Sequence, residues 1–259
     1  MSKLKLVLFV LVAASSLLYA RAATPFADEL VAYHPGAAYA PGFVHPVSAL
    51  GELSQTNPFG DPVDPFNPPF GTNQIVSIGA GGWLEVRWHT PILNHPHNPY
   101  GRDFTIFGNS GFIITNDFDL ERFEWIGTPA TDGSLFGFNP GVTRVLVSRD
   151  GRTYFELDLT LASITDGFPT DPAGDPCVPI DPALVPDDFA GATLAGIRSL
   201  YGGSAGGASF DISWAMDASH QPVFLPEINY VRVEVLTGRS EIDGLAKVAR
   251  SSAAKGRMD

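Results

Sequence analysis

Apolar and polar residues alternate along two segments of the chain, residues 83–89 and 228–236. In the first segment, Leu84, Val86 and Trp88 occupy every second position. Because successive side chains of a β-strand point to opposite faces of its sheet, each segment is predicted to be a strand with one face in a core and the other in water. The residues expected to face water in the first segment are Glu85, Arg87 and His89.

Residues 145–157 contain a predicted β-hairpin. Two short apolar runs meet there at Asp150 and Gly151. An Asp-Gly pair tolerates the positive φ angles of a tight primed turn, and the flanking valine, tyrosine and phenylalanine residues suit a half-buried pleated surface. The hairpin is the strongest local indication that the chain is built from antiparallel strands.

Short strand-like runs, separated by proline and glycine, make up much of the remaining chain. Further strands are predicted at residues 75–79, 104–107, 111–114 and 210–216. Residues 26–69 are rich in Pro, Gly and Asn and are predicted to wrap a sheet without forming one. Residues 162–188 are expected to form a long irregular loop. One helix is predicted at residues 192–201, where three apolar residues share a face and Gly202-Gly203 follows.

About eight strands joined by turn-rich loops predict an all-β fold. We expect an antiparallel, jelly-roll-like β-sandwich with long loops and one short helix. The sandwich is expected to occupy residues 23–248 as a single domain. Residues 249–259 are small, polar and basic, and they are predicted to form a disordered tail.

The first 22 residues have the pattern of a secretory signal peptide. Lys3 and Lys5 precede a short apolar run, and Ala20-Arg21-Ala22 offers small residues for cleavage. We therefore expect a secreted or periplasmic protein, in part associated with the cell surface, with no membrane span after cleavage; an N-terminal anchor is the alternative. The net charge is −12, and cleavage makes the chain more acidic, so nucleic acid is not an expected partner.

Several motifs together resemble a known group of proteins. Residues 145–155 and 230–234 are similar to the paired core strands of discoidin-type, galactose-binding-like β-sandwich domains. A closer resemblance, over residues 24–248, is to exported bacterial proteins, some of which carry cell-surface sorting tails. The motifs of this closer resemblance lie at residues 67–76, 81–84, 103–109, 206–211 and 241–243. Residues 255–259 do not form the hydrophobic helix of a sorting tail, so anchoring through such a tail is not expected.

Carboxylates and amides near the expected strand ends form a candidate metal site. Asp103 and Asn109 flank the strand at residues 104–107, and Glu241 and Asp243 would project to the same side of an extended chain. Such hard oxygen ligands suit Ca²⁺, and the resemblance implies a structural calcium near the junction of an early loop and the final strand. The predicted calcium ligands are Asp103, Asn109, Asp211, Glu241 and Asp243. The alternative is that these residues form turns and bind their own backbone.

Aromatic residues in loops are candidates for ligand binding. Tyr100 and Trp125 are expected to reach solvent, whereas Trp88, Phe107 and Trp214 are expected in the core. Sugar-binding modules stack flat rings on pyranose faces and pair them with polar side chains. The predicted ligand-binding residues are Tyr100, Trp125, Asn98 and Arg102.

The sequence thus predicts an exported binding or cell-surface interaction module, with a glycan or cell-surface polymer as its partner and a structural calcium ion. No residue is predicted to be catalytic. Two alternatives stay open. A carbohydrate-active hydrolase would need an acid and a base at a defined separation across the sugar, which a sequence does not give. A structural envelope protein would bind no small ligand.

Overall fold

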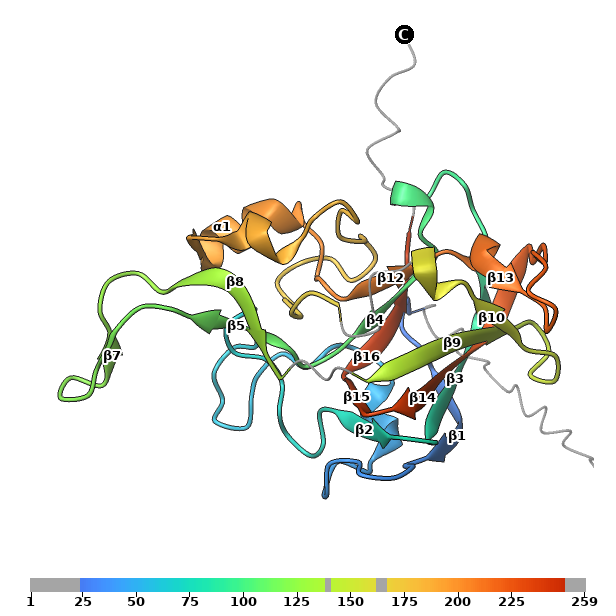
Figure 1. Cartoon of the computed structure of the whole chain (residues 1–259), viewed down its shortest axis with the longest axis horizontal. Helices are drawn as coiled ribbons and strands as arrows, with labels where there is room; N and C mark the ends of the chain where they lie inside the picture. Colours follow the sequence, from blue (N-terminus) through green and yellow to red (C-terminus); the bar gives the residue numbers. More distant parts are fainter. Residues whose placement is uncertain (1–23, 138–140, 162–166, 250–259) are drawn as a thin grey trace, which may run out of the picture.

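The computed structural model describes residues 24–137, 141–161 and 167–249 (Figure 1). The predicted signal peptide and nearly all of the predicted tail lie outside the described residues, so both stay predictions. Within the described part of the chain, no helix is long and apolar enough to cross a membrane.

One layer of the fold is a six-stranded antiparallel sheet. Its order is β1 (Glu29–His34), β3 (Trp83–Leu93), β14 (Glu227–Thr237), β9 (Val142–Ser148), β10 (Phe155–Leu157) and β13 (Ala215–Met216). Two neighbouring inner strands of this sheet, β3 and β14, are those that the alternating pattern predicts. Val86 lies opposite Val231 and Leu84 opposite Val233, so the apolar positions of the two strands lie side by side.

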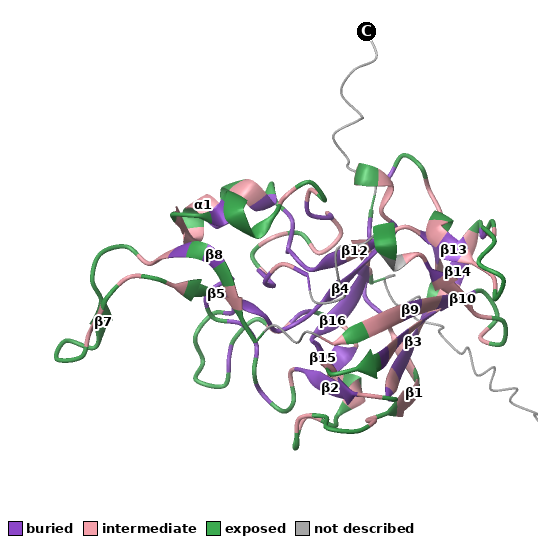
Figure 2. Cartoon of the chain, viewed as in Figure 1, coloured by how far each residue is buried: buried purple, intermediate pink, exposed green. Residues whose placement is uncertain are grey.

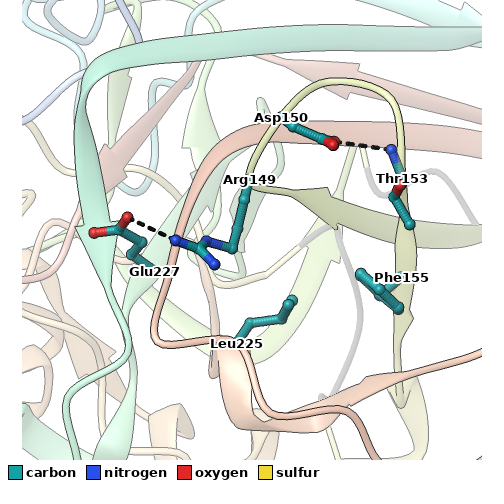
Figure 3. A pocket seen from close by; sticks show the side chains of 6 residues that line it. All are labelled: Arg149, Asp150, Thr153, Phe155, Leu225 and Glu227. Atoms are coloured by element: carbon teal, nitrogen blue, oxygen red, sulfur yellow. Dashed lines mark hydrogen bonds and ion pairs between the residues drawn. The ribbon is translucent and has the colours of Figure 1, made fainter.

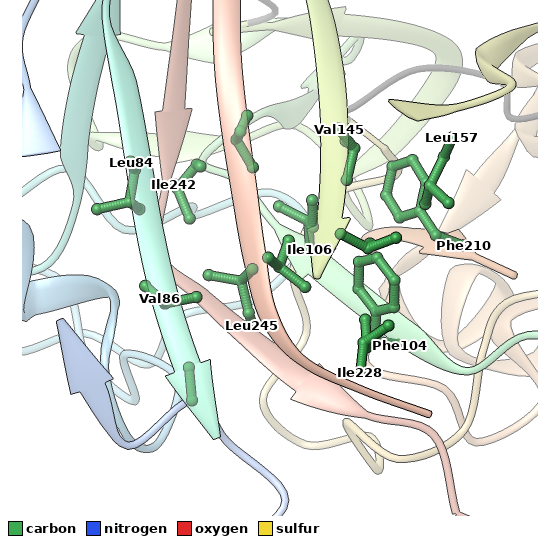
Figure 4. Close-up of a cluster of buried hydrophobic side chains, with 14 of the residues drawn as sticks. Leu84, Val86, Phe104, Ile106, Val145, Leu157, Phe210, Ile228, Ile242 and Leu245 are labelled. Atoms are coloured by element: carbon green, nitrogen blue, oxygen red, sulfur yellow. The ribbon is translucent and has the colours of Figure 1, made fainter. Parts of the chain in front are cut away.

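The second layer consists of two smaller antiparallel sheets. Their orders are β12 (Ala208–Phe210), β4 (Phe104–Phe107), β16 (Gly244–Lys247), and β15 (Arg239–Ile242), β2 (Val76–Gly79). Leu84, Val86 and Val145 of the large sheet share one buried cluster with Ile106 and Leu245 of the second layer (Figure 4). Full burial of one such side chain contributes roughly 1.5–3 kcal/mol. The predicted antiparallel β-sandwich is therefore confirmed.

A smaller hydrophobic cluster lies beside the sandwich. It is formed by a three-stranded sheet, the helix and a 3-10 turn, in the order β11 (Ala192–Thr193), β8 (Ala130–Phe136), β5 (Gly111–Ile114), with α1 (Leu194–Tyr201) and η4 (Pro186–Phe189). The Phe189 ring centre lies 4.8 Å from that of Phe112 and 5.9 Å from that of Tyr201. Thr193 caps α1 and Gly202 ends it in the left-handed conformation, so the predicted helix is confirmed with a start two residues later.

β5 and β8 continue into an arm, residues 111–136, whose tip projects to the far left of Figure 1 and is exposed in Figure 2. At the tip, β6 (Phe118–Asp119) pairs with β7 (Glu124–Trp125). Between the two ladders the Asn116 side chain joins the strands, because its amide donates to the carbonyls of Ile126 and Thr128 (both 3.1 Å) and its oxygen accepts from the Ala130 N–H (2.7 Å). The arm is thus hydrogen-bonded along its length.

Glu85 departs from the alternating pattern. It was expected to face water, yet its exposed fraction is 3%. Arg232, opposite it on β14, donates to its carboxylate at 2.6 and 2.9 Å, and the Tyr154 hydroxyl donates to the same group. Tyr154 comes from the loop after β9 and its ring lies 4.3 Å from the Arg232 guanidinium. The prediction was wrong here because side chains from other segments cover the polar face of β3.

The predicted hairpin forms with a longer turn. Phe155 of β10 lies opposite Val147 of β9, but residues 149–154 form a loop between the two strands. Gly151 has a φ of +69°, whereas Asp150 acts through its carboxylate, which accepts from the N–H groups of Arg152 and Thr153 (both 2.9 Å). The hairpin is confirmed, and the tight primed turn is wrong.

Two further segments differ from the prediction. Residues 26–69 include β1, which pairs along β3, so this segment forms part of the sheet. The predicted strand at residues 210–216 breaks after β12, because Asp211 accepts from the Ser213 N–H (2.7 Å) and begins a 3-10 turn. The remaining 3-10 turns are η1 (Pro46–Ala49), η2 (Pro99–Gly101), η3 (Leu159–Leu161) and η5 (Ile212–Trp214).

Candidate functional site

Three loops gather at one end of the sandwich, and we call this surface the loop end: residues 94–103, 149–154 and 211–226. These loops lie at the right and top of Figure 1. Leu93, the last residue of β3, pairs with Glu227, the first residue of β14, which brings the first and third loops together. The Asn94 side chain donates to the Leu225 carbonyl and its N–H to the Pro226 carbonyl, both at 2.9 Å.

Asp103 anchors two of these loops. It is fully buried at the start of β4, and its carboxylate accepts from the Asn98 side chain (2.9 Å), the His95 N–H (3.0 Å) and the Ile212 N–H (2.9 Å). Burial raises the pKa of Asp103 to about 6, the three donors act against that rise, and nearby Asp211 adds to it. A buried carboxylate with three donors fixes the two loops relative to each other.

Tyr100 stands at the apex of the loop that Asp103 anchors. Its exposed fraction is 55% and its φ is +55°, a left-handed conformation that bulky side chains rarely adopt. The loop imposes this conformation, since the Gly101 N–H donates to the Asn98 carbonyl (2.9 Å) and the Arg102 N–H to the Pro99 carbonyl (3.1 Å). Such local strain is a feature of functional sites when the surrounding structure holds it in place.

Arg102, two residues after this tyrosine, places its guanidinium over a second ring. Its guanidinium lies 4.3 Å from the ring centre of Trp214, which is half-buried. Burial lowers the pKa of Arg102, and the neighbouring Asp211 carboxylate acts in the opposite direction. The loop end therefore presents an exposed ring, a guanidinium over an indole, and a carboxylate.

Hollows border the Asp103-anchored loop on two sides. His95 and Asn98 line one of about 370 Å³, together with Leu93 and Lys247. Arg102 lines another hollow, of about 140 Å³, together with Phe168 and Ile180 of the loop predicted at residues 162–188. A third hollow, of about 460 Å³, lies at the β9–β10 loop (Figure 3). The loop end is therefore recessed in several places.

The third hollow has an apolar floor and a charged rim. Phe155 and Leu225 line it, and Arg149 forms an ion pair with Glu227 (3.2 Å) beside them (Figure 3). Across the hollow, Asp150 holds the loop by accepting from Thr153. Backbone N–H donors lower the pKa of Asp150. Asp150 was predicted to take part in the turn but not in a site.

The four predicted ligand-binding residues fall into two groups. Tyr100, Asn98 and Arg102 lie together at the loop end, although Asn98 is buried and binds Asp103. Trp125, with an exposed fraction of 37%, lies on the arm, far from the loop end in Figure 1. Sequence reasoning missed Phe224, an exposed ring of the loop end. Its position between Pro222 and Pro226 was the sequence feature that could have identified it as a loop residue.

Of the three rings expected in the core, Trp88 and Phe107 are fully buried, whereas Trp214 is only partly buried against the core. Its other surface contacts Arg102. The pattern could not distinguish the two roles, because a ring at the edge of a core also faces a loop.

The five predicted calcium ligands do not converge. Asp103 and Asp211 lie at the loop end, whereas Asn109, Glu241 and Asp243 lie at the other end of β4. β4 and β16 run antiparallel between the two groups: the Val248 N–H donates to the Asp103 carbonyl, and the Asp243 N–H to the Phe107 carbonyl. Four residues of strand therefore separate the groups, by more than about 10 Å.

Most of the carboxylate oxygens in the two groups already accept hydrogen bonds from the protein. Asp243 accepts from the Ser54 hydroxyl (2.6 Å) and N–H, and burial raises its pKa to about 7. Glu241 accepts from the Asn109 amide (2.9 Å) and lies 3.4 Å from Arg239. The buried Asn109 Oδ1 has no partner among the described residues.

Ca²⁺ takes six to eight oxygens, and within the described ranges no three His, Cys, Asp or Glu side chains form a metal-binding group. The five residues therefore do not fit one calcium site, and calcium binding stays a prediction. Melting curves with calcium and with a chelator test it, because a calcium-dependent rise that Glu241→Gln abolishes would establish the site and coincident curves would remove it.

No family model and no curated protein matches this chain. Among solved structures, a pectin binding carbohydrate binding module, determined in a monoclinic crystal form, aligns over 87% of this chain and 94% of its own, with 9% sequence identity and a TM-score of 0.30. A similarity of this degree carries no inference about the ligand of this chain, and the resemblance to discoidin-type domains stays a prediction.

Proposed function

We propose that this protein is an exported carbohydrate-binding module whose ligand site is the loop end. One observation carries the proposal: Tyr100 is exposed and is held in a left-handed conformation by a loop anchored on buried Asp103. An exposed ring on a fixed loop can stack on the apolar face of a pyranose with little loss of backbone entropy on binding.

Polar groups of the loop end supply the hydrogen bonds that a sugar needs. The Arg102 guanidinium offers donors and the Asp211 carboxylate offers acceptors, so the two together match neighbouring hydroxyl groups of a pyranose. At the β9–β10 loop, Arg149 is already paired with Glu227. Because the chain is strongly acidic and these arginines have acidic neighbours, we expect a neutral glycan in preference to a polyanion.

Catalysis is a weaker explanation of the same surface. A glycosidase needs an acid and a base that both reach the sugar. Asp103 has the raised pKa of a general acid, but its carboxylate is fully buried and its oxygens accept from protein donors. We therefore assign Asp103 a positioning role and no chemical step.

A glycan array tests the proposal with four proteins. Wild type and Tyr100→Phe, which keeps the ring, are expected to give the same pattern of bound neutral glycans. Tyr100→Ala removes the ring and is expected to lose binding by roughly tenfold or more, or about 1.4 kcal/mol. Tyr39→Ala, at another partly exposed tyrosine, is the matched control and should leave the pattern unchanged. Background signal from all four proteins would contradict the proposal and favour a structural role.

Export is part of the proposal and rests on the leader pattern of residues 1–22. Expression in a secreting host followed by mass spectrometry of the released protein tests it. We expect a mature N-terminus at Ala23. A full-length protein retained in the cytoplasm would contradict export without affecting the proposed ligand site.

A further inference from the structure

We propose that the arm carries a second pyranose-binding site, in a hollow between the arm and α1 that we call the arm hollow. Its volume is about 350 Å³, and most of its surface is apolar. A cavity of this size lies at the lower end of the range for small-ligand sites. This inference rests on the proposed function, since it assigns a second site for the same class of ligand.

Trp125 forms one wall of the arm hollow. Its exposed fraction is 37%, and its ring packs edge-on against Phe118 with the centres 4.9 Å apart, which holds the indole in place. Phe123 packs against Phe118 in the same way (5.4 Å) and has a φ of +56°. Together with the hydrogen bonds of Asn116, these contacts make the arm an ordered support for the indole.

The floor of the arm hollow is apolar and comes from three separate segments. Phe66 belongs to the loop before β2, Ile114 ends β5, and Leu194 begins α1. All three contribute to the smaller hydrophobic cluster beside the sandwich, so the floor continues into a packed interior. A floor of this kind excludes water beneath a bound ring and favours the C–H face of a sugar.

The rim of the arm hollow supplies polar groups next to this floor. Asp64, Asn67, Thr128 and Thr193 also line it. Asp64 accepts from the Phe66 N–H (2.7 Å) and from the Asn67 side chain (3.1 and 3.2 Å), so the carboxylate and the amide are held together. A fixed acceptor beside an amide and hydroxyl groups matches the alternating donors and acceptors of a neutral pyranose.

Charge near the arm hollow disfavours an anionic sugar. Asp64 lies on its rim, and the tip of the arm carries Asp117, Asp119, Glu121 and Glu124 with one arginine, Arg122. That arginine lies near Asp119 (3.7 Å) and Glu124 (3.9 Å), so its charge is already offset. The ligand class that fits is therefore a neutral hexopyranose or pentopyranose.

The two proposed sites lie on different sides of the molecule. In Figure 1, β7 is at the far left and the loop of residues 94–101 is at the upper right. A chain with two weak sites gains avidity on a repetitive polymer, because the second site binds at the high effective concentration set by the first. One molecule would thus bridge two glycan segments.

Saturation-transfer NMR with methyl glycosides of glucose, galactose, mannose and xylose tests the second site. The proteins are wild type, Tyr100→Ala, Trp125→Ala and the double variant. We expect each single variant to keep a signal from the glycoside that wild type binds and the double variant to lose it. Leu120→Ala, at an exposed tip residue outside the arm hollow, is the matched control and should behave as wild type.

Two outcomes separate the inference from the proposed function. If Tyr100→Ala alone removes every signal, the arm hollow does not bind sugar and the loop end stands. If Trp125→Ala alone removes every signal, the loop end is wrong and the arm hollow stands. If Trp125→Ala fails to fold, Asn67→Ala tests the arm hollow instead, because it leaves the indole in place. Added to Tyr100→Ala, it should lower the signal that remains in that variant. An unchanged signal there overturns the second site.

Discussion

The pH dependence of stability through Asp103 follows from a competition between burial and hydrogen bonding. Burial disfavours the charged carboxylate, whereas three N–H donors favour it. Burial prevails, and the pKa rises from 3.8 to about 6. The folded protein therefore holds more protons than the unfolded chain between about pH 4 and pH 6, so stability falls as pH rises through that window.

The rise of about two pKa units corresponds to about 3 kcal/mol, since each unit is worth about 1.36 kcal/mol. Asp103→Asn removes this titration. In either orientation of the new amide, its N–H groups face a backbone or side-chain donor, which lowers the free energy of unfolding by about 1–3 kcal/mol. The wild type should thus be clearly more stable than the variant near pH 4, and the difference should shrink by about 3 kcal/mol by about pH 7.

Urea unfolding of the two proteins at a series of pH values, followed by tryptophan fluorescence, measures this difference. Asp150→Asn is the matched control, because backbone donors lower the pKa of this exposed carboxyl and its contribution is lost as pH falls, the opposite sign. A difference between wild type and Asp103→Asn that stays flat, or that grows with pH, would show that the donors prevail over burial and would refute the reasoning.

Two further predictions concern packing and a buried charge. Phe104→Ala, in the centre of the sandwich core, should lower the free energy of unfolding by about 3–5 kcal/mol, whereas Leu120→Ala on the arm tip should change it by less than about 0.5 kcal/mol in the same urea assay. Arg198→Met leaves the buried Asp171 carboxylate without its bidentate partner (2.7 and 3.1 Å), and half-exposure of the arginine limits the loss to about 1–3 kcal/mol. Adding Asp171→Asn should recover part of that loss in a thermal melt, and a double variant less stable than Arg198→Met would contradict the assignment.

The alternating pattern was sufficient for the long central strands because their burial depends on local periodicity. β3 and β14 pair where their apolar positions coincide; β14 extends one residue beyond the predicted range at each end, and β3 extends four residues beyond its predicted end. Local signals were also enough for α1, since its cap at Thr193 and its end at Gly202 directly flank the helix in the sequence. β8 gave no such signal, because Asp132, Gly133 and Ser134 interrupt its apolar residues.

The candidate sites were harder to predict, because they depend on which chain segments meet. Tyr100 and Trp125 had the same sequence signature, an aromatic residue beside turn-forming residues, yet one belongs to the loop end and the other to the arm. Asp103 and Asp243 both lie beside β4 and β16, but at opposite ends of the pair. Spacing along the chain does not show at which end of a strand a side chain will find its partners.

Titration calorimetry of the best neutral glycan from the array tests the central claim most directly, with the Tyr100 protein and Tyr100→Ala compared at matched folded fractions, each carrying Trp125→Ala so that the arm hollow does not contribute. We predict a dissociation constant raised by roughly tenfold or more in the variant, with Tyr100→Phe close to the Tyr100 protein. Equal affinity for all three proteins would show that the ring held at the loop end does not contact the sugar, and the proposed site would then be wrong.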